Sequence, residues 1–282
     1  MQGCNRAYTF CCDPLLLQTP VWPAALCPAE PDASVIFAMN ETRIDRLGRN
    51  YDITTSKRHS FGTDAIILAK FSDAPANGRI CDLGTGCGII PMLLSVWGIK
   101  AHVDAVDIQP DAIDMLNETV ERNGLSDRIY PVCCDLKQLK NVLPRGCYDL
   151  VICNPPYRTI GSGAVCKDEG LRVARFEVSA NISDVCLAGS KLLRTGGRLC
   201  ICNRPDRLPD SVEAMRRSGF SLSRLRLVQQ RSDGRAWLFL MEGIKSGKSQ
   251  LCILPALIIE DNKGGYTPEM KDVYGEFAES AE

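Results

Sequence analysis

Asp82-Leu-Gly-Thr-Gly-Cys-Gly88 lies between a short apolar segment and a longer one, Ile89-Ile-Pro-Met-Leu-Leu-Ser-Val-Trp97. This order predicts a buried strand, a glycine-rich turn and a helix. Gly84, Gly86 and Gly88 permit tight turning and a close approach of the backbone to a ligand. The spacing G-x-G-x-G differs from that of dinucleotide-binding proteins, and no Lys-Ser or Lys-Thr follows as in a P-loop. The segment therefore predicts a ligand-binding turn, although such turns also occur for packing alone.

Two acidic residues follow the next two predicted strands. Asp107 ends Ala101-His-Val-Asp-Ala-Val-Asp107, about 20 residues after the glycines, where an acid can bind ribose hydroxyls. Asp135 follows the third strand and can accept a hydrogen bond from an adenine amino group. The alternative for both residues is to cap the segment that comes after them.

The fourth predicted strand, Tyr148–Cys153, is followed by Asn154-Pro-Pro-Tyr157. The side-chain oxygen of Asn154 can accept a hydrogen bond from an N–H group. The two prolines fix their own φ angles and favour extended geometry in the residue before each. Tyr157 can stack on a planar group. These residues predict a rigid corner for a planar primary amide or a nucleobase amino group, with a simple Pro-rich turn as the alternative.

Strands and helices alternate along most of the chain. Alternation of this kind predicts βαβ units, a mostly parallel sheet and right-handed crossovers. Strands are predicted near 79–83, 101–107, 128–134, 148–153 and 197–203, with a final antiparallel pair near 220–229 and 235–243; helices are predicted near 87–97, 111–123, 179–194 and 207–218. Ligands of such sheets bind beyond the carboxyl ends of the strands. The glycine turn and Asn154 both fall there.

Three segments are predicted along the chain. Residues 1–38 hold five prolines and four cysteines without periodicity, which predicts a poorly ordered or non-native extension; a small segment packed on the sheet is the alternative. Residues 39–75 predict an N-terminal cap, with strands around a Gly-Arg-Asn turn in 45–60 and a short helix from Phe61 to Lys70. Residues 76–282 predict the main ligand-binding domain.

The order and spacing of the glycine turn, Asp107 and Asn154-Pro-Pro-Tyr157 resemble class I S-adenosylmethionine-dependent methyltransferases. The resemblance is to the amino-methylating branch, in which the Asn-Pro-Pro-Tyr corner holds the acceptor nitrogen. It implies an α/β, Rossmann-like fold with a seven-stranded, mostly parallel sheet and helices on both faces. It also implies S-adenosylmethionine as the cofactor.

Further segments are similar to the bacterial tRNA1(Val) adenine-N6 methyltransferases, and the similarity covers about residues 41–277. These segments are Phe61-Gly-Thr-Asp-Ala-Ile-Ile-Leu-Ala69, Asn154-Pro-Pro-Tyr-Arg-Thr-Ile-Gly-Ser-Gly163, Ala174-Arg-Phe-Glu177, Asn203-Arg-Pro-Asp-Arg-Leu208 and Gly265-Tyr-Thr-Pro-Glu269. The similarity implies methylation of the exocyclic amine of an adenine beside the anticodon of a tRNA. Phe176 departs from the family, which has His there.

The site residues fall into three groups. The acceptor corner is predicted to be Asn154, Pro155, Pro156 and Tyr157. The cofactor is predicted to contact Asp82, Gly84, Gly86, Gly88, Asp107, Asp135, Phe61 and Asp64. The residues expected to contact RNA are Arg175, Arg204 and Arg207, the last two within a region, 191–248, that has 13 Lys or Arg against 5 Asp or Glu. A solvated surface without RNA is the alternative for that region.

Other functions remain open at this point. A protein N5-glutamine methyltransferase uses the same corner, but its helical N-terminal domain does not match the short, β-like 40–75 segment. An rRNA N-methyltransferase or a non-catalytic RNA-binding module are further alternatives, although binding alone does not need the acceptor corner.

Composition agrees with a cytoplasmic enzyme of this kind. The chain has 282 residues, 45% of them hydrophobic, and a net charge of −1, so it is not a polycation. Its 15 cysteines are scattered and form no C-x-x-C pair, and there are only two histidines, so neither disulfides nor a metal site are expected. No apolar run is long enough to span a membrane. Nothing in the sequence indicates an oligomeric state.

Overall fold

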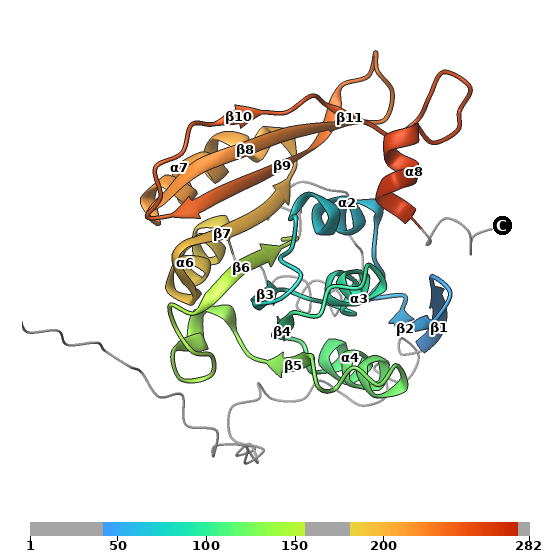
Figure 1. Ribbon diagram of the computed structural model, residues 1–282, viewed down its shortest axis with the longest axis vertical. Coiled ribbons are helices and arrows are strands. Elements are labelled where there is room, and N and C mark those ends of the chain that lie inside the picture. The colour runs from blue at the N-terminus through green and yellow to red at the C-terminus, as the bar shows by residue number, and fades with distance from the viewer. Residues whose placement is uncertain (1–41, 156–180, 276–282) are drawn as a thin grey trace, which may run out of the picture. The chain divides into compact units, whose positions relative to one another are not determined.

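A computed structural model describes residues 42–155 and 181–275, all within one compact unit of the chain, Met39–Glu282 (Figure 1). Its centre is a sheet of nine strands in the order β10-β8-β9-β7-β6-β3-β4-β5, with β11 also paired to β8. The strands are β3 (Arg79–Leu83), β4 (His102–Asp107), β5 (Ile129–Cys133), β6 (Tyr148–Cys153), β7 (Leu193–Asn203), β8 (Phe220–Gln229), β9 (Ala236–Lys245), β10 (Cys252–Ile253) and β11 (Leu257–Ile258).

The first five strands of this sheet, β3 to β7, are all parallel, and β9 pairs antiparallel with both β7 and β8. The predicted α/β, Rossmann-like fold with seven strands is therefore confirmed as β3 to β9. The sequence did not predict β10 and β11, which are two residues each and run parallel to β8. The chain passes from β3 outward to β5 and then returns to β6 on the other side of β3, which places the topological switch point between β3 and β6.

Helices cover both faces of the sheet, as predicted (Figure 1). The helices are α2 (Thr63–Phe71), α3 (Ile89–Val96), α4 (Pro110–Arg122), α6 (Ile182–Leu192), α7 (Leu208–Arg217) and α8 (Pro268–Tyr274), with short 3₁₀ turns η1 (Leu136–Asn141) and η2 (Pro205–Arg207). One apolar core joins α2, α3, α4 and α8 to the sheet, and a second joins α6, α7 and η1 to the other face. Alternate residues of each strand enter the two cores because successive side chains point to opposite faces.

The N-terminal cap is a hairpin, β1 (Thr42–Leu47) and β2 (Tyr51–Ser56), around the predicted turn. It is joined to α4 by side-chain contacts, since Thr119 Oγ1 accepts from the Thr54 amide at 2.9 Å and Asn123 Oδ1 accepts from the Asp52 amide at 3.0 Å. The second half of the cap is α2, whose Ala65 to Ala69 are buried between α3 and the sheet.

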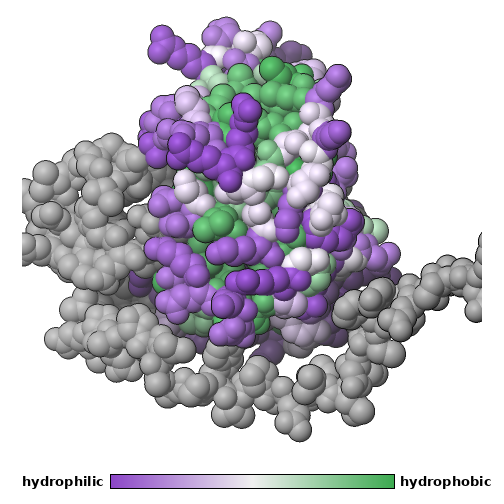
Figure 2. Space-filling model, turned by 90° about the vertical axis from the view of Figure 1, so that its left-hand side faces the viewer, coloured by the Kyte–Doolittle hydropathy of each residue, from purple (hydrophilic) through white to green (hydrophobic). Residues whose placement is uncertain are grey.

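The outer side of α7 is strongly polar. Ser211, Ala214 and Met215 face the core, whereas Glu213 and Arg216 are exposed, as in an amphipathic surface helix. Seen from the side on which α6 and α7 lie in Figure 1, the surface is mostly hydrophilic, with an apolar area near the top (Figure 2). No helix among the described residues is both long and apolar enough to cross a membrane.

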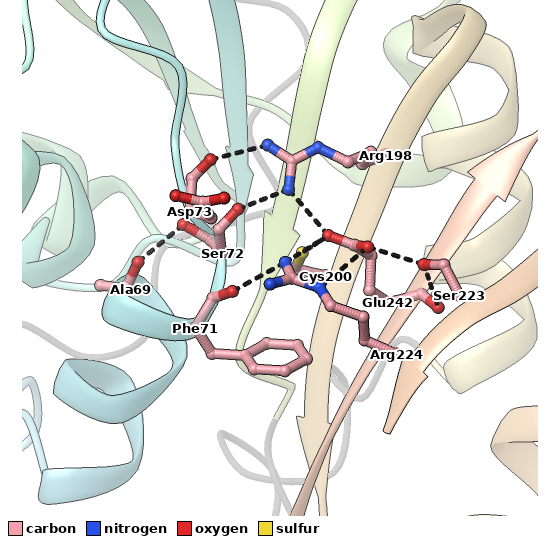
Figure 3. A network of polar contacts seen from close by, with 9 residues as sticks. All are labelled: Ala69, Phe71, Ser72, Asp73, Arg198, Cys200, Ser223, Arg224 and Glu242. Atoms are coloured by element: carbon pink, nitrogen blue, oxygen red, sulfur yellow. Dashed lines mark hydrogen bonds and ion pairs between the residues drawn. The ribbon is translucent and has the colours of Figure 1, made fainter. Parts of the chain in front are cut away.

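A network of charged side chains ties α2 to the antiparallel end of the sheet (Figure 3). Glu242 on β9 is 3% exposed and accepts hydrogen bonds from Arg198 Nη1 at 2.7 Å, Arg224 Nη2 at 2.6 Å and Ser223 Oγ at 2.6 Å. The same guanidinium groups donate to the carbonyls at the C-terminal end of α2, namely Phe71, Ser72 and Asp73. The helix end, which lacks intrahelical donors, is satisfied in this way.

We expect Glu242→Gln to lower the free energy of unfolding by roughly 3–5 kcal/mol, because two arginines lose their buried counter-charge. Burial raises the pKa of Glu242, but the hydrogen bonds from Arg224, Ser223 and Arg198 outweigh it and leave the pKa below 4.5. The carboxylate therefore stabilises the fold above about pH 4.5, and this contribution disappears as the pH falls through the lowered pKa. Urea unfolding of both proteins from pH 3 to 8 measures the difference.

Glu213→Gln is the matched control for this experiment, since Glu213 pairs with Arg217 on the exposed side of α7. Loss of this exposed ion pair should change the free energy of unfolding by no more than about 1 kcal/mol. An equal effect of both substitutions would contradict the structural role given to Glu242.

Candidate active site

The glycine turn is held against the neighbouring strand by backbone contacts. The amides of Gly84 and Thr85 both donate to the carbonyl of Val106, at 2.8 and 2.9 Å. The amide of Gly86 donates to Asp107 Oδ2 at 2.9 Å. The turn therefore lies at the carboxyl edge of the sheet between β3 and β4, where ligands of this fold bind.

The three glycines serve different purposes. Gly84 and Gly86 have φ of +74° and +56°, and an added Cβ at either would enter open space. The absence of a side chain at these two positions allows a ligand to approach the backbone closely. At Gly88, with φ of +83°, an added Cβ would collide with Leu116. Gly88 is therefore needed for packing of α3 against α4, in addition to any contact with a ligand.

The two predicted nucleoside-binding acids already accept hydrogen bonds from backbone amides. Asp107 Oδ1 accepts from the Gln109 amide at 3.0 Å, at the start of α4, while Oδ2 takes the Gly86 amide. Asp135 Oδ1 accepts from the Lys137 amide at 2.9 Å and caps η1. A carboxylate oxygen can accept more than one hydrogen bond, so these contacts leave room for a ligand hydroxyl or amine.

Asp82 lacks such partners. Its side chain is 1% exposed, and neither of its carboxylate oxygens, nor the hydroxyl of Thr85, has a hydrogen-bond partner within the described part of the chain. Burial raises the pKa of Asp82 to about 7; the nearby Thr85 hydroxyl lowers it in part, and the negative charge of Asp107 adds a smaller rise. A buried carboxylate without a donor is costly, so this position favours a bound amine or cation.

The acceptor corner contains Asn154, which follows β6 on the same edge of the sheet. Asn154 Nδ2 donates to Asp64 Oδ2 at 3.0 Å, and Cys202 Sγ lies 3.1 Å from Asn154 Oδ1. A carboxylate accepts only, so the Asp64 contact fixes which end of the amide is nitrogen. Asn154 Oδ1 is thereby set as the acceptor atom of the corner.

Asp64 reaches Asn154 from the first turn of α2. Gly62 makes this possible, because a Cβ at that position would lie 2.5 Å from Asp64 Oδ1. Thr63 Oγ1 and the Tyr274 hydroxyl, 3.2 Å apart, join the same turn to α8. Phe61, just before it, is half-buried against the core.

The structure places the remaining predicted residues as follows. Pro155 is buried directly after Asn154, whereas Pro156, Tyr157 and Arg175 lie outside the described residues. Arg204 and Arg207 follow β7 at the same sheet edge and pair with Asp206 at 3.1 Å and Asp210 at 3.0 Å. No group of three or more His, Cys, Asp or Glu side chains in the described ranges is placed to hold a metal ion.

Sequence reasoning missed Cys202 as a neighbour of Asn154. It lies on β7, which pairs with β6 so that Cys153 is opposite Ile201. Buried cysteines occur along several strands, and burial raises the pKa of Cys81 and Cys153 well above the ordinary thiol value. No pattern in the sequence separates Cys202 from these core thiols.

Comparison with known proteins agrees with this geometry. The profile of the methyltransferase small domain family matches residues 55–207, more than half of the chain. A predicted O-methyltransferase from Agrobacterium tumefaciens has a similar structure, with a TM-score of 0.61 and 24% identity over 76% of this chain and 96% of that chain. The Pyrococcus horikoshii protein TYW2, solved with MeSAdo, has a TM-score of 0.52 at 12% identity, covering 73% of this chain and 72% of that chain.

Curated relatives are similar over the same part. A protein of Porphyromonas gingivalis named tRNA1(Val) (adenine(37)-N6)-methyltransferase is 28% identical over 181 residues, which are 62% of this chain and 67% of the relative. A protein of Yersinia pseudotuberculosis with the same name is 27% identical over 141 residues, 50% of this chain. The chain spans 55% of the length of that Yersinia relative.

The fold is that of a class I methyltransferase, and S-adenosylmethionine is the cofactor of this class. The chain belongs to the methyltransferase small domain family. The residues present fit this cofactor. The glycine backbone at Gly84 and Gly86 is open to a ligand, and the carboxylate of Asp82 is buried without a donor, which suits a molecule carrying an ammonium group.

We expect Asp82 to make the stability of the free protein fall with rising pH. Its folded pKa is about 7 and its ordinary value is 3.8, so between these values the folded state holds a proton that the unfolded state has released. Relative to Asp82→Asn, the free energy of unfolding of the wild type should fall by on the order of 4 kcal/mol between pH 4 and pH 7. Above pH 7 the difference between the two proteins should stay constant. Urea unfolding over this range measures the difference.

Cofactor binding gives a second measurement at the same residue. If a ligand amine contacts Asp82, the affinity for S-adenosylhomocysteine should rise with pH up to about 7 in the wild type and stay flat in Asp82→Asn. If calorimetric titrations give parallel pH profiles of affinity for the two proteins, Asp82 does not contact the cofactor.

Proposed function

We propose that this methyltransferase acts on the exocyclic N6 amine of an adenine in tRNA. The observation that carries the proposal is the oriented amide of Asn154: Nδ2 donates to Asp64, so Oδ1 is the acceptor atom of the corner, where it also accepts from the Cys202 thiol at 3.1 Å. It stands at the carboxyl edge of β6, beside the switch point at which the glycine turn also lies. The names of the relatives from Porphyromonas gingivalis and Yersinia pseudotuberculosis support the choice of tRNA and adenine.

The chain's part in the reaction is to bind and orient the acceptor. The lone pair of an aromatic amine is delocalised into the ring, so the nitrogen is a poor nucleophile. Hydrogen bonds from the amine to Asn154 Oδ1 and the Pro155 carbonyl favour a pyramidal nitrogen and direct its lone pair. Correct placement of two reactants can supply several of the roughly 7–11 kcal/mol available from orientation. S-adenosylmethionine supplies an electrophilic methyl group when bound.

Asp64 is assigned a positioning role in this scheme. Its carboxylate, held beside Asn154 Nδ2, prevents the amide from rotating to present nitrogen instead of oxygen. This is a more specific role than the cofactor contact expected from the sequence, and the two are separable by experiment.

RNA binding is assigned to the rim formed by Arg204 and Arg207. Arg204 is exposed and Arg207 is partly exposed, and their partners Asp206 and Asp210 are in the same segment. Exposed pairs of this kind contribute about 0–1 kcal/mol, so the guanidinium groups can exchange them for phosphates. Much of the basic excess in 191–248 is not available in this way, because Arg198 and Arg224 are committed to Glu242.

Nucleoside mass spectrometry tests the function directly. Unmodified tRNA, rRNA and a release-factor protein are each incubated with the enzyme and isotopically labelled S-adenosylmethionine. We expect labelled N6-methyladenosine in the tRNA alone. Labelled glutamine in the protein, labelled rRNA, or no transfer to any of the three would refute the proposal.

Asn154→Ala should lower kcat for tRNA methylation by at least 100-fold and leave the affinity for S-adenosylhomocysteine within about 3-fold, because the amide orients the acceptor nitrogen and contributes through placement. Asp64→Ala should also lower kcat at saturating cofactor, because the Asn154 amide loses the carboxylate that orients it. Single-turnover kinetics and calorimetry on each variant provide the two readouts.

Arg207→Ala is the control, since it should raise the KM for tRNA with kcat nearly unchanged. If Asp64→Ala weakens cofactor binding and keeps the wild-type kcat at saturation, Asp64 is a cofactor residue and the positioning role is wrong.

A further inference from the structure

A depression of about 560 Å³ opens beside the first turn of α2. Its walls come from α2, the end of β8, the start of β9 and the chain after β11, and its lining includes Asp64, Gln230, Trp237, Ile259, Glu260 and Tyr266. Asp64 belongs both to this lining and to the acceptor corner, because its carboxylate lies 3.0 Å from Asn154 Nδ2. The depression is therefore next to the corner and separated from it by a single side chain.

Exposed aromatic rings are concentrated here. Three Phe, Tyr or Trp side chains of the described residues are more than a third exposed, and two of them, Trp237 at 37% and Tyr266 at 42%, line this depression. The ring of Tyr266 is held in place by stacking on Tyr274, with centroids 5.0 Å apart and planes inclined by 25°. Rigid exposed aromatic faces are typical of sites that stack the bases of single-stranded nucleic acids.

The polar groups of the depression are also fixed. Gln230 Nε2 donates to Glu260 Oε1 at 2.7 Å, and Arg231 Nε donates to Glu260 Oε2 at 3.1 Å. The amide of Gln230 is thereby oriented, and its oxygen has no partner among the residues that the structure describes. The carboxylate of Glu260 is neutralised by Arg231, while the exposed Arg235 has no ion pair within the same part of the chain.

We propose that this depression binds a second unpaired base of the RNA, the immediate neighbour of the adenine held at Asn154. The inference rests on the proposed function and adds a subsite to it. Trp237 stacks on the neighbouring base, the Gln230 oxygen accepts a hydrogen bond from its edge, and Arg235 contacts the adjoining phosphate. A pocket of this size is typical for a ligand of nucleoside dimensions or larger. Stacking tolerates any base, so this subsite contributes affinity and positions the strand without a strict sequence requirement.

Tryptophan fluorescence tests occupancy of the subsite. In the double variant Trp22→Phe, Trp97→Phe, the emission comes from Trp237 alone, because the chain has three tryptophans. The probe is an RNA hairpin with one adenine in its loop that the enzyme methylates, compared with two copies that carry an abasic nucleotide 5′ or 3′ of that adenine. We expect the intact hairpin to quench the emission and one of the abasic copies to lose the quenching. Equal quenching by all three hairpins, or none, overturns the inference.

Kinetics supply the independent readout. Trp237→Ala should raise the KM for the hairpin roughly 5- to 100-fold, as expected for loss of one stacked base, with the KM for S-adenosylmethionine unchanged. Trp237→Phe should retain most of the affinity. The abasic substitution that weakens binding by the wild type should have no further effect in Trp237→Ala. Additive effects of the two changes would show that Trp237 does not contact that base.

Tyr130→Ala is the matched control, since Tyr130 is also 37% exposed but stacks on His102, at the opposite end of β4 from the glycine turn. Its KM for the hairpin should not change. Thermal melts of all variants verify that they are folded. Normal methylation of the hairpin with no effect at Trp237 refutes this subsite alone, whereas failure of the wild type to methylate any RNA refutes the proposed function.

Discussion

Glu242 accepts hydrogen bonds from Arg198 and Arg224, and through these arginines one buried carboxylate holds three strands and the C-terminal end of α2 together. The other end of α2 carries Asp64, which contacts Asn154. A helix of nine residues is about 13 Å long and behaves as a rigid rod on this scale. The position of the Asn154 amide, the proposed acceptor group, therefore depends on an ion network about two helical turns away. A contact this remote from the reaction still belongs to its geometry.

Strands β3 to β9 of the central sheet were predictable because each of them has a strong local signal. Runs such as Leu150–Cys153 are continuously apolar and end at turn residues, which is typical of strands buried on both faces. The position of the glycine turn and of Asn154 at strand ends was predictable from chain order, and the structure has both there. In contrast, β10 and β11 are two-residue pairings that depend on where β8 already lies, so no local pattern indicates them. Helix α8 was not predicted, although Thr267 followed by Pro268 is a typical N-terminal signal of a helix.

Contacts between distant segments account for what the sequence left open. The Asp64–Asn154 hydrogen bond joins residues 90 positions apart, and nothing in Phe61–Ala69 says which side chain the carboxylate will meet. Trp237 lies in an almost continuous apolar run, Ala236 to Met241, so the sequence cannot distinguish this exposed ring from the buried residues after it. A capping role was foreseen as the alternative for both Asp107 and Asp135. Asp135 caps η1, whereas Asp107 accepts from the Gln109 amide without capping α4. Both carboxylates keep the capacity to accept a further hydrogen bond from a ligand.

The direction of the Asn154 amide has a consequence for which bases the proposed site can admit. Its nitrogen donates to Asp64, so the group that the proposed corner turns toward an incoming base is the carbonyl oxygen. A base that carries a keto group in place of the amine, such as hypoxanthine or guanine, would bring oxygen against oxygen with no hydrogen between them. Two desolvated acceptors facing each other are unfavourable, since neither recovers the hydrogen bond it had with water. The corner would therefore exclude deaminated adenine by repulsion, and the enzyme would need no further residue to make that distinction.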